Sequence, residues 1–366
     1  MAKIGIFSDV HISRSSSIMP TYLDESKTYT TRLNMCIDSM KWAYEQFMNN
    51  KVDVIINCGD TFNSHTVSSD ELSALSKIIL ETNIPLHFPN YTILGNHDKF
   101  NNVFNSLSWV NLLEDTTLVN DYIHLAYDDT DIYCISYYES SEFTNKIQEM
   151  LTTYPRECSK AILFMHGDIN GSKLSGNKSI TNEIGQDKLI DNFDLIINGH
   201  IHCHDVIYNK DDKKIINIGS LTTHSFADSN NHLGKCYILD TKTLEITDIE
   251  NPHQIIFRAF SYTEPIKLHE ELKAIQHLNT IVKIKCNSKD KETVESILSH
   301  YDNIIKYKLV ISYDRLDTIP DASNDVVEDE DNNINNINVD TQFVTFLNSR
   351  TDLKADVNRY LSLLNE

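Results

Sequence analysis

The sequence predicts a layered α/β fold for the first two-thirds of its 366 residues. Short apolar runs rich in isoleucine and valine alternate there with segments whose apolar residues recur at helical spacing. Apolar runs without polar alternation are typical of strands that are buried on both faces. Strands of this kind, interleaved with helices, indicate sheets that are covered by helices.

Eight runs of strand length follow one another along the chain: Ile4–Phe7, Val54–Cys58, Tyr91–Leu94, Ile132–Ile135, Ala161–Met165, Leu195–Asn198, Ile215–Ile218 and Cys236–Leu239. Helical spacing of apolar residues predicts two helices among the early runs, one over residues 33–47 and one over residues 72–79. We therefore treat residues 1–252 as one domain.

The pattern changes near Asn251 and Pro252. Residues 253–316 predict the order strand, helix, strand, helix, strand, with helices near 267–276 and 289–300 and strands over 280–286 and 304–313. This segment has ten Lys and Arg against eight Asp and Glu, a net charge of +2, so the rest of the chain carries −23. A second, small α/β domain is expected here.

The last fifty residues divide into two parts. Residues 317–340 contain eight acidic residues, no basic ones and many asparagines, a composition that predicts a disordered linker. Within residues 341–366, Leu353, Val357, Tyr360, Leu361 and Leu364 fit one helical face. After a long acidic tether, we expect that helix to bind a partner; the alternative is that it packs on its own core.

Composition narrows the class of protein. The net charge is −21 with a pI near 5.0, which argues against coating DNA by bulk positive charge but leaves a metal-dependent nuclease open. No apolar run approaches the length of a membrane span, and the amino terminus does not resemble a signal peptide. Seven scattered cysteines without a CxxC pair favour free thiols in a reducing cytosol. We expect a cytoplasmic protein without membrane contact.

Five short polar motifs each follow a predicted strand: Asp9-x-His11, Gly59-Asp60, Gly95-Asn96-His97-Asp98, His166-Gly167 and Gly199-His200-x-His202. Residues at the carboxyl ends of strands can converge on one crevice. Carboxylate, amide oxygen and imidazole suit hard or borderline divalent ions, and the absence of thiolate argues against a structural zinc site. Each motif alone is weak, but five in order predict a two-metal site that can hold a hydroxide nucleophile at a phosphoryl group.

The motif set resembles the calcineurin-like metallophosphoesterases over about residues 1–250. The resemblance implies a four-layer αββα sandwich with a dinuclear site at one edge. It also implies that one metal takes Asp9, His11, Asp60 and His202, and the other takes Asp60, Asn96, His166 and His200. His97 would face the scissile phosphate, where it stabilises charge or protonates the leaving oxygen. Asp98 would orient His97.

Within that family, the nuclease branch fits best. The stretch after Gly59-Asp60 lacks both the Arg of serine/threonine phosphatases and the Tyr of purple acid phosphatases. Gly-Asp-x-Phe, Gly-Asn-His-Asp, Gly-His-x-His and Ile218-Gly219-Ser220-Leu221 look like the Mre11/SbcD nucleases and their phage recombination exonuclease relatives. That resemblance implies two metal ions, Mn2+ with Mg2+ as the alternative, and DNA as substrate. It also implies that 253–316 is a capping domain and that 341–366 binds a Rad50/SbcC-type SMC-like ATPase.

Some expectations stay open. Family members often form homodimers, so a homodimer is possible for this chain. If the chain is viral, we expect it in the host cytoplasm. Asn63 stands where some relatives carry His, which leaves the balance between exonuclease and endonuclease activity undecided. Two other functions compete with the nuclease: a small-molecule phosphodiesterase or phosphatase, and a metal-binding scaffold without turnover.

The predicted capping domain carries a further candidate site. Its lysines alternate with apolar residues in two runs, so that four of them can share the polar face of one sheet: Lys283, Lys285, Lys306 and Lys308. Rows of this kind supply phosphate contacts, which makes these lysines candidates for DNA binding. The alternatives are a binding surface for the ATPase and an ordinary solvated sheet face.

Overall fold

The computed structural model describes residues 2–23, 28–82, 88–112, 115–173, 179–181, 183–226 and 233–312. All of them belong to one compact unit, Met1–Asp314. The predicted linker at 317–340 and the predicted helical segment at 341–366 lie outside the described residues. Among the residues described, no helix is both long enough and apolar enough to span a membrane.

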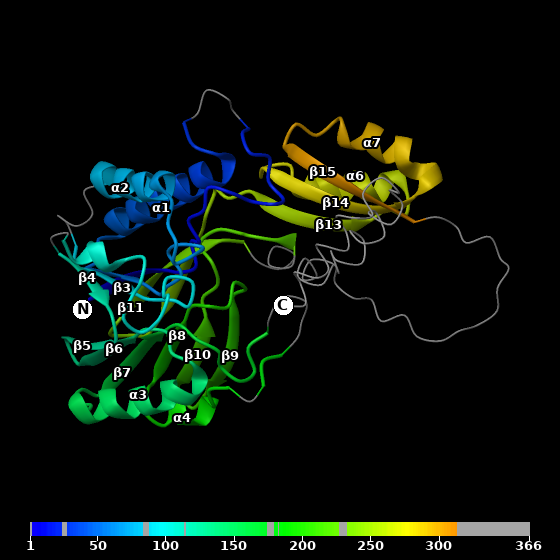
Figure 1. The fold of residues 1–366 in the computed structure, drawn as a ribbon. Coiled ribbons are helices and arrows are strands. Elements are labelled where there is room, and N and C mark those ends of the chain that lie inside the picture. Colours follow the sequence, from blue (N-terminus) through cyan, green and yellow to red (C-terminus); the bar gives the residue numbers. More distant parts are fainter. Residues whose placement is uncertain are drawn as a thin grey trace, which may run out of the picture. The chain divides into compact units, whose positions relative to one another are not determined.

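Two six-stranded sheets form the larger part of the unit (Figure 1). The first has the order β12-β11-β1-β2-β3-β4, with bounds Ile246–Glu250, Lys235–Asp240, Lys3–Phe7, Val54–Asn57, Asn90–Ile93 and Thr116–Val119. The second has the order β5-β6-β7-β8-β10-β9, with bounds Tyr122–Tyr127, Thr130–Ile135, Lys160–Met165, Leu195–Asn198, Lys213–Asn217 and Asp205–Lys210. The central strands β1, β2 and β3 are parallel, as are β6, β7 and β8.

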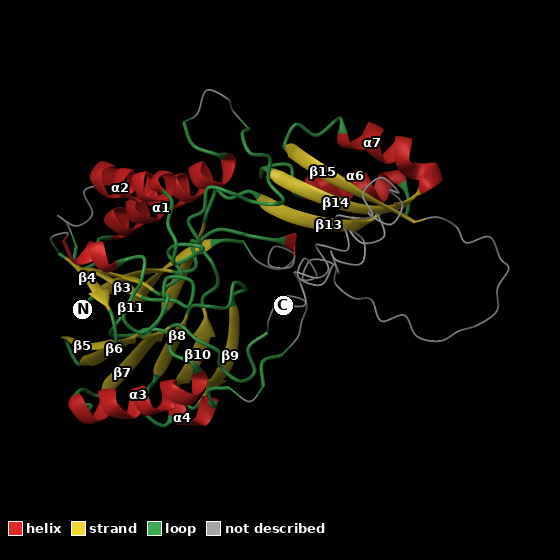
Figure 2. Ribbon diagram, viewed as in Figure 1, coloured by secondary structure: helices red, strands yellow, loops and turns green. Residues whose placement is uncertain are grey.

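Helices cover the outer face of each sheet, and the two inner faces pack together (Figure 2). The helices are α1 and α2 on the first sheet and α3 and α4 on the second, with bounds Thr31–Asn50, Ser69–Thr82, Ser140–Thr153 and Gln186–Ile190. The core between the sheets includes Ile4, Ile56, Ile162 and Ile197. The predicted four-layer αββα sandwich is therefore confirmed.

Helix α1 shows how the outer layer forms. The side chain of Thr30 accepts a hydrogen bond from the backbone N–H of Leu33 and begins the helix, and Lys51 ends it in the left-handed conformation. Phe47 lies fully buried against β1. A Cβ atom at Gly5 would come within 2.7 Å of the Phe47 ring, so a glycine is needed for this close approach.

A third sheet follows in the chain. Its three parallel strands have the order β13-β14-β15, with bounds Ile256–Ser261, Thr280–Asn287 and Ile304–Ser312, and its helices are α6, Pro265–Ala274, and α7, Lys291–Leu298. This confirms the predicted order of elements. Both helices pack on one face of the sheet, around Leu272, Ile284 and Ile297. The opposite face contributes Phe257 and Ile281 to a cluster with Met19 and with Met35 of α1.

A candidate dinuclear metal centre

The five motifs converge at the carboxyl ends of β1, β2, β3, β7 and β8. This follows from the parallel direction of the strands, because their carboxyl ends lie at the same edge of each sheet. All seven predicted ligands meet there, and their donor atoms form two groups.

The first group holds the side chains of Asp9, His11, Asp60 and His202. Nε2 of His11 lies 3.1 Å from Nε2 of His202 and 3.5 Å from Oδ2 of Asp60. Oδ1 of Asp9 lies 3.8 Å from Nε2 of His11 and 3.9 Å from Nε2 of His202. Two ligands about 2.1 Å from one ion lie roughly 3–4.2 Å apart, depending on the angle between them, so these four atoms can share a cation.

The second group holds Asp60, Asn96, His166 and His200. Nε2 of His166 lies 3.4 Å from Oδ2 of Asp60 and 3.1 Å from Oδ1 of Asn96. Nδ1 of His200 lies 2.9 Å from the same Asn96 oxygen. Oδ2 of Asp60 thus belongs to both groups, as expected for a carboxylate that bridges two ions.

The chemistry of the donors fits cations. Nδ1 of His166 lies 2.8 Å from the carbonyl oxygen of Cys58, which can only accept, so Nδ1 carries a proton. When the ring is neutral, its Nε2 therefore turns a lone pair toward Asn96. Oδ1 of Asp9 is buried without a hydrogen-bond partner. Lone pairs gathered in this way repel one another unless a cation lies between them.

The charges of the site point the same way. Burial opposes ionisation of Asp60, but His166 and His11 outweigh it and hold the pKa of Asp60 well below its usual range. Burial also lowers the pKa of His166, yet the charge of Asp60 dominates and raises that pKa to about 9. A proton on His166 can therefore stand in for a cation in the metal-free protein.

Four of the seven ligands have an unusual backbone. Asp9, His11, Asp60 and His200 have φ between 47° and 71°, a region that residues other than glycine rarely adopt. Such strain costs on the order of 1–3 kcal/mol per residue and is typical of functional sites. Hydrogen bonds hold these turns together: the N–H groups of Asp9 and His11 donate to the carbonyls of Gly59 and Asp60 at 3.0 Å.

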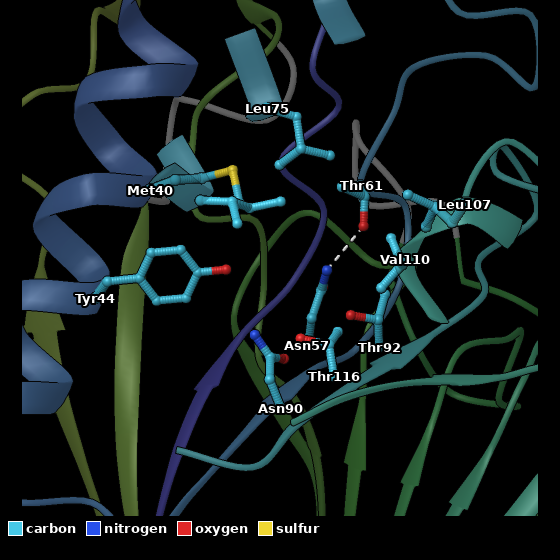
Figure 3. A pocket seen from close by; sticks show the side chains of 11 residues that line it. Met40, Tyr44, Asn57, Thr61, Leu75, Asn90, Thr92, Leu107, Val110 and Thr116 are labelled. Carbon is cyan, nitrogen blue, oxygen red and sulfur yellow. Dashed lines mark hydrogen bonds between the residues drawn. The ribbon is translucent and has the colours of Figure 1, made fainter. Parts of the chain in front are cut away.

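A polar pair positions the loop that carries Asp60. Oδ1 of Asn57 accepts from the N–H of Gly59 at 3.2 Å, and Nδ2 of Asn57 donates to Oγ1 of Thr61 at 2.8 Å. Figure 3 shows this pair at the wall of a small cavity of about 40 Å³ between the first sheet and helices α1 and α2. The side chain of Asn57 thus fixes the turn from the buried side, away from the metal groups.

Gly95 is required beside Asp60. A Cβ atom at Gly95 would lie 2.0 Å from Oδ1 of Asp60 and 2.5 Å from its backbone nitrogen. We expect Gly95→Ala to displace the bridging carboxylate and to weaken Mn2+ binding at least tenfold, measured by isothermal titration. Gly167→Ala is the matched control, because its Cβ would meet nothing closer than 3.6 Å although Gly167 follows His166. Equal affinity in the two variants would contradict this account of Gly95.

His97 lies at the edge of the first group. One of its ring nitrogens lies within 4.8 Å of donor atoms of His11 and Asp60, so distance alone would also allow it to bind a metal. Its ring is exposed and packs edge-on against the ring of His11 at 4.8 Å. Its Nδ1 donates to the carbonyl oxygen of Asn63 at 2.9 Å, which leaves Nε2 for a substrate. A hollow of about 210 Å³ opens here, lined by Asp60, His97, Lys173, His200, Ile201, His202 and Cys203.

The expectation that Asp98 orients His97 is wrong. The carboxylate of Asp98 is fully buried and accepts from the N–H groups of Thr61, Phe62 and Gly95 at 3.0–3.2 Å. Burial, together with the charge of Asp60, raises the pKa of Asp98 to about 7. Asp98 therefore ties the Asp60 loop to the Asn96 loop, and the group that orients His97 is the backbone carbonyl of Asn63.

Sequence reasoning missed Asp168 and Ser8. Oδ1 of Asp168 lies 3.1 Å from Nε2 of His200, so it orients this ring from outside the metal group. The hydroxyl of Ser8 donates to Oδ2 of Asp9, which leaves Oδ1 for the metal. Both residues are adjacent or nearly adjacent to a motif, but no spacing rule in a single sequence distinguishes them from ordinary loop residues.

The four candidate lysines lie on β14 and β15. The strand register pairs Lys283 with Lys308 and Lys285 with Val310, so Lys283, Lys285, Lys306 and Lys308 share the face without helices. Lys306 donates to the carbonyl of Ile18, and Lys283 lies 6.0 Å from the centre of the Phe226 ring. None of these four lysines is among the residues that line the hollow over the metal groups.

Comparison with known proteins supports this geometry. The family model described as calcineurin-like phosphoesterase matches residues 2–204, more than half of the chain, and this span contains all seven predicted ligands. Among solved structures, a dimetal phosphatase from Danio rerio is similar over 68% of this chain and 99% of that chain, with 10% sequence identity and a TM-score of 0.44. So low a TM-score adds nothing to the family match.

Proposed function

The chain belongs to the calcineurin-like phosphoesterase family, and on that premise we propose that it is a DNA nuclease of the Mre11/SbcD type. The observation that carries the proposal is the pair of donor groups that share Oδ2 of Asp60, with His97 beside them at the rim of an open hollow. Such a site can act on a phosphodiester that lies across the surface. The finer assignment to DNA rests on the arguments below.

The metals belong to the proposal as well. We assign Asp9, His11, Asp60 and His202 to one divalent ion and Asp60, Asn96, His166 and His200 to the other, with Mn2+ as the preferred ion and Mg2+ as the alternative. When bound, the ions would neutralise charge on the phosphoryl oxygens and lower the pKa of a water.

The protein's own residues would complete the reaction. His97, held through Nδ1 by Asn63, presents Nε2 to the leaving oxygen and can protonate it or stabilise its charge. Lys173 lines the same hollow and is exposed. Its Nζ lies 4.0 Å from Oδ2 of Asp205. It is placed to contact a neighbouring phosphate, so Lys173 is a candidate for binding rather than for chemistry.

One feature argues against a protein phosphatase and another favours DNA over a small molecule. The stretch after Asp60 lacks the substrate Arg typical of protein phosphatases. The four lysines on the open face of the third sheet form a row that suits a phosphate backbone: Lys283, Lys285, Lys306 and Lys308.

The negative net charge of the chain bears on its expected protein partner. A net charge of −21 repels DNA, so we expect the isolated chain to bind DNA weakly and a Rad50/SbcC-type ATPase to supply affinity through residues 341–366. Residues 253–316 would then act as a capping domain and residues 317–340 as the tether. A homodimer remains part of this proposal.

The test uses the full chain with Mn2+ and labelled linear and circular DNA. The salt concentration is kept at about 50 mM, because the affinity of electrostatic DNA binding falls steeply with ionic strength. Cleavage that needs Mn2+ supports the nuclease, and cleavage of circles identifies endonuclease activity. Bis(p-nitrophenyl) phosphate, assayed in parallel, reports whether the metal centre is active at all.

A small-molecule phosphodiesterase is the second candidate, favoured by the same acidic charge. It predicts hydrolysis of bis(p-nitrophenyl) phosphate and of nucleotide phosphodiesters, with both DNA substrates left intact. That result would overturn the nuclease proposal and leave the metal centre standing.

A further inference from the structure

A buried arginine lies directly behind the segment that carries two of the ligands. Arg32, in the first turn of α1, is only 5% exposed. Its Nη2 lies 2.9 Å from the carbonyl oxygen of Val10 and 3.1 Å from that of His11, and its Nη1 lies 3.1 Å from the carbonyl oxygen of Thr223. The guanidinium thus binds backbone carbonyls, which can only accept.

The same guanidinium sets the state of His224. Nη2 of Arg32 lies 2.6 Å from Nδ1 of His224. Because a guanidinium has donors and no acceptor, Nδ1 must accept, and the proton of the neutral ring lies on Nε2. Nε2 then donates to the carbonyl oxygen of Asp9 at 3.1 Å. Both ring nitrogens of His224 are therefore engaged.

This arrangement excludes His224 as a metal ligand, although its distances to two ligands would allow it. The rings of His11 and His202 lie 4.8 and 4.9 Å from the ring of His224, and the three could hold a metal ion by distance alone. With Nδ1 directed at Arg32 and Nε2 at Asp9, however, His224 has no lone pair to give to an ion. Its role must be exerted through the backbone.

Three consecutive carbonyls are held in this way, those of Asp9, Val10 and His11. Asp9 and His11 are two of the residues with φ near +50°, a conformation that needs support from its surroundings. We propose that Arg32 and His224 are positioning residues that together hold the strained Asp9–His11 segment in the geometry that binds the first metal. This inference concerns the metal centre alone and holds whether the substrate is DNA or a small phosphodiester.

The test titrates Mn2+ into the full-length protein by calorimetry. We expect His224→Ala to retain two Mn2+ sites and to bind one of them 10- to 100-fold less tightly, the range found when partners of metal ligands are removed. His224→Gln places an amide nitrogen near the position of Nε2 and should restore most of the affinity. His224→Asn keeps an acceptor for Arg32 but loses the bond to Asp9, so it should resemble the alanine variant.

Two further variants complete the design. Arg32→Lys keeps the charge but cannot reach all four acceptors, so it should also weaken Mn2+ binding about tenfold or more. His204→Gln is the control: His204 follows the ligand His202 by two residues, but its ring stacks on Tyr237. Circular dichroism of the metal-free variants checks that each one folds.

Two outcomes would overturn the proposal. Loss of one full Mn2+ equivalent in His224→Ala, with no recovery in His224→Gln, would make His224 a ligand. Affinity within twofold of the parent in the folded His224→Ala and Arg32→Lys variants would show that the segment needs neither residue. Neither readout depends on which substrate is hydrolysed, so failure here is distinct from failure of the nuclease proposal.

Discussion

Asp60→Ala is expected to abolish Mn2+ binding at both donor groups and to lower phosphodiester hydrolysis about 1,000-fold or more. The reason is geometric, because Oδ2 of Asp60 lies within 3.5 Å of the imidazole nitrogens of both His11 and His166. Its other oxygen accepts from the N–H of His97 at 2.9 Å. One carboxylate would thus serve both metals, and it also anchors the loop of His97.

The measurement combines Mn2+ titration with hydrolysis of bis(p-nitrophenyl) phosphate at saturating Mn2+. Asp38→Asn is the control, since Asp38 is an exposed acid of α1 that has no place in the centre. If Asp60→Ala still bound two equivalents of Mn2+ with the parent affinity, the proposed sharing of Asp60 would be wrong.

His97→Ala is expected to separate catalysis from metal binding. Hydrolysis should fall about 100- to 10,000-fold, the range for a general acid or base, whereas Mn2+ affinity should change less than about threefold. His97 is exposed, lies at the edge of the first donor group and bonds to the carbonyl of Asn63, so its removal leaves all seven assigned ligands in place.

His269→Ala provides the matched control. His269 is a histidine of α6 that contacts Tyr301 beside the third sheet, so it takes no part in the metal centre. Parallel loss of Mn2+ binding in His97→Ala would assign His97 to the metals instead. If His97→Ala left both hydrolysis and cellular function unchanged, the chain would act as a metal-binding scaffold.

Most of the sandwich could be predicted from the sequence. The eight apolar runs correspond to the eight interior strands of the two large sheets: β1, β2, β3, β6, β7, β8, β10 and β11. The four strands that the pattern missed are the edges of those sheets, β12, β4, β5 and β9. An edge strand is partly exposed and carries polar residues, as the sequence of β9, Asp-Val-Ile-Tyr-Asn-Lys, illustrates.

The helices divide in the same manner. Helices α1 and α2 follow from their apolar spacing, and both were expected. Helix α3 was not expected, because only Phe143, Ile147 and Met150 of its fourteen residues are buried. Three contacts on one face are enough for packing but too few to distinguish the segment from a polar loop.

The sequence by itself was enough to predict which side chains meet at the site, because metal ligands are recognisable residue types and parallel strands carry their carboxyl ends to one edge. It could not determine what holds those ligands. The bond between His224 and Asp9 joins residues 215 positions apart, and the bonds of Arg32, Asp98 and Asn63 involve backbone carbonyls or N–H groups. Every residue has these groups, so no motif marks the ones that are used. Only the packing of α1 and of the loops against the sheets selects them.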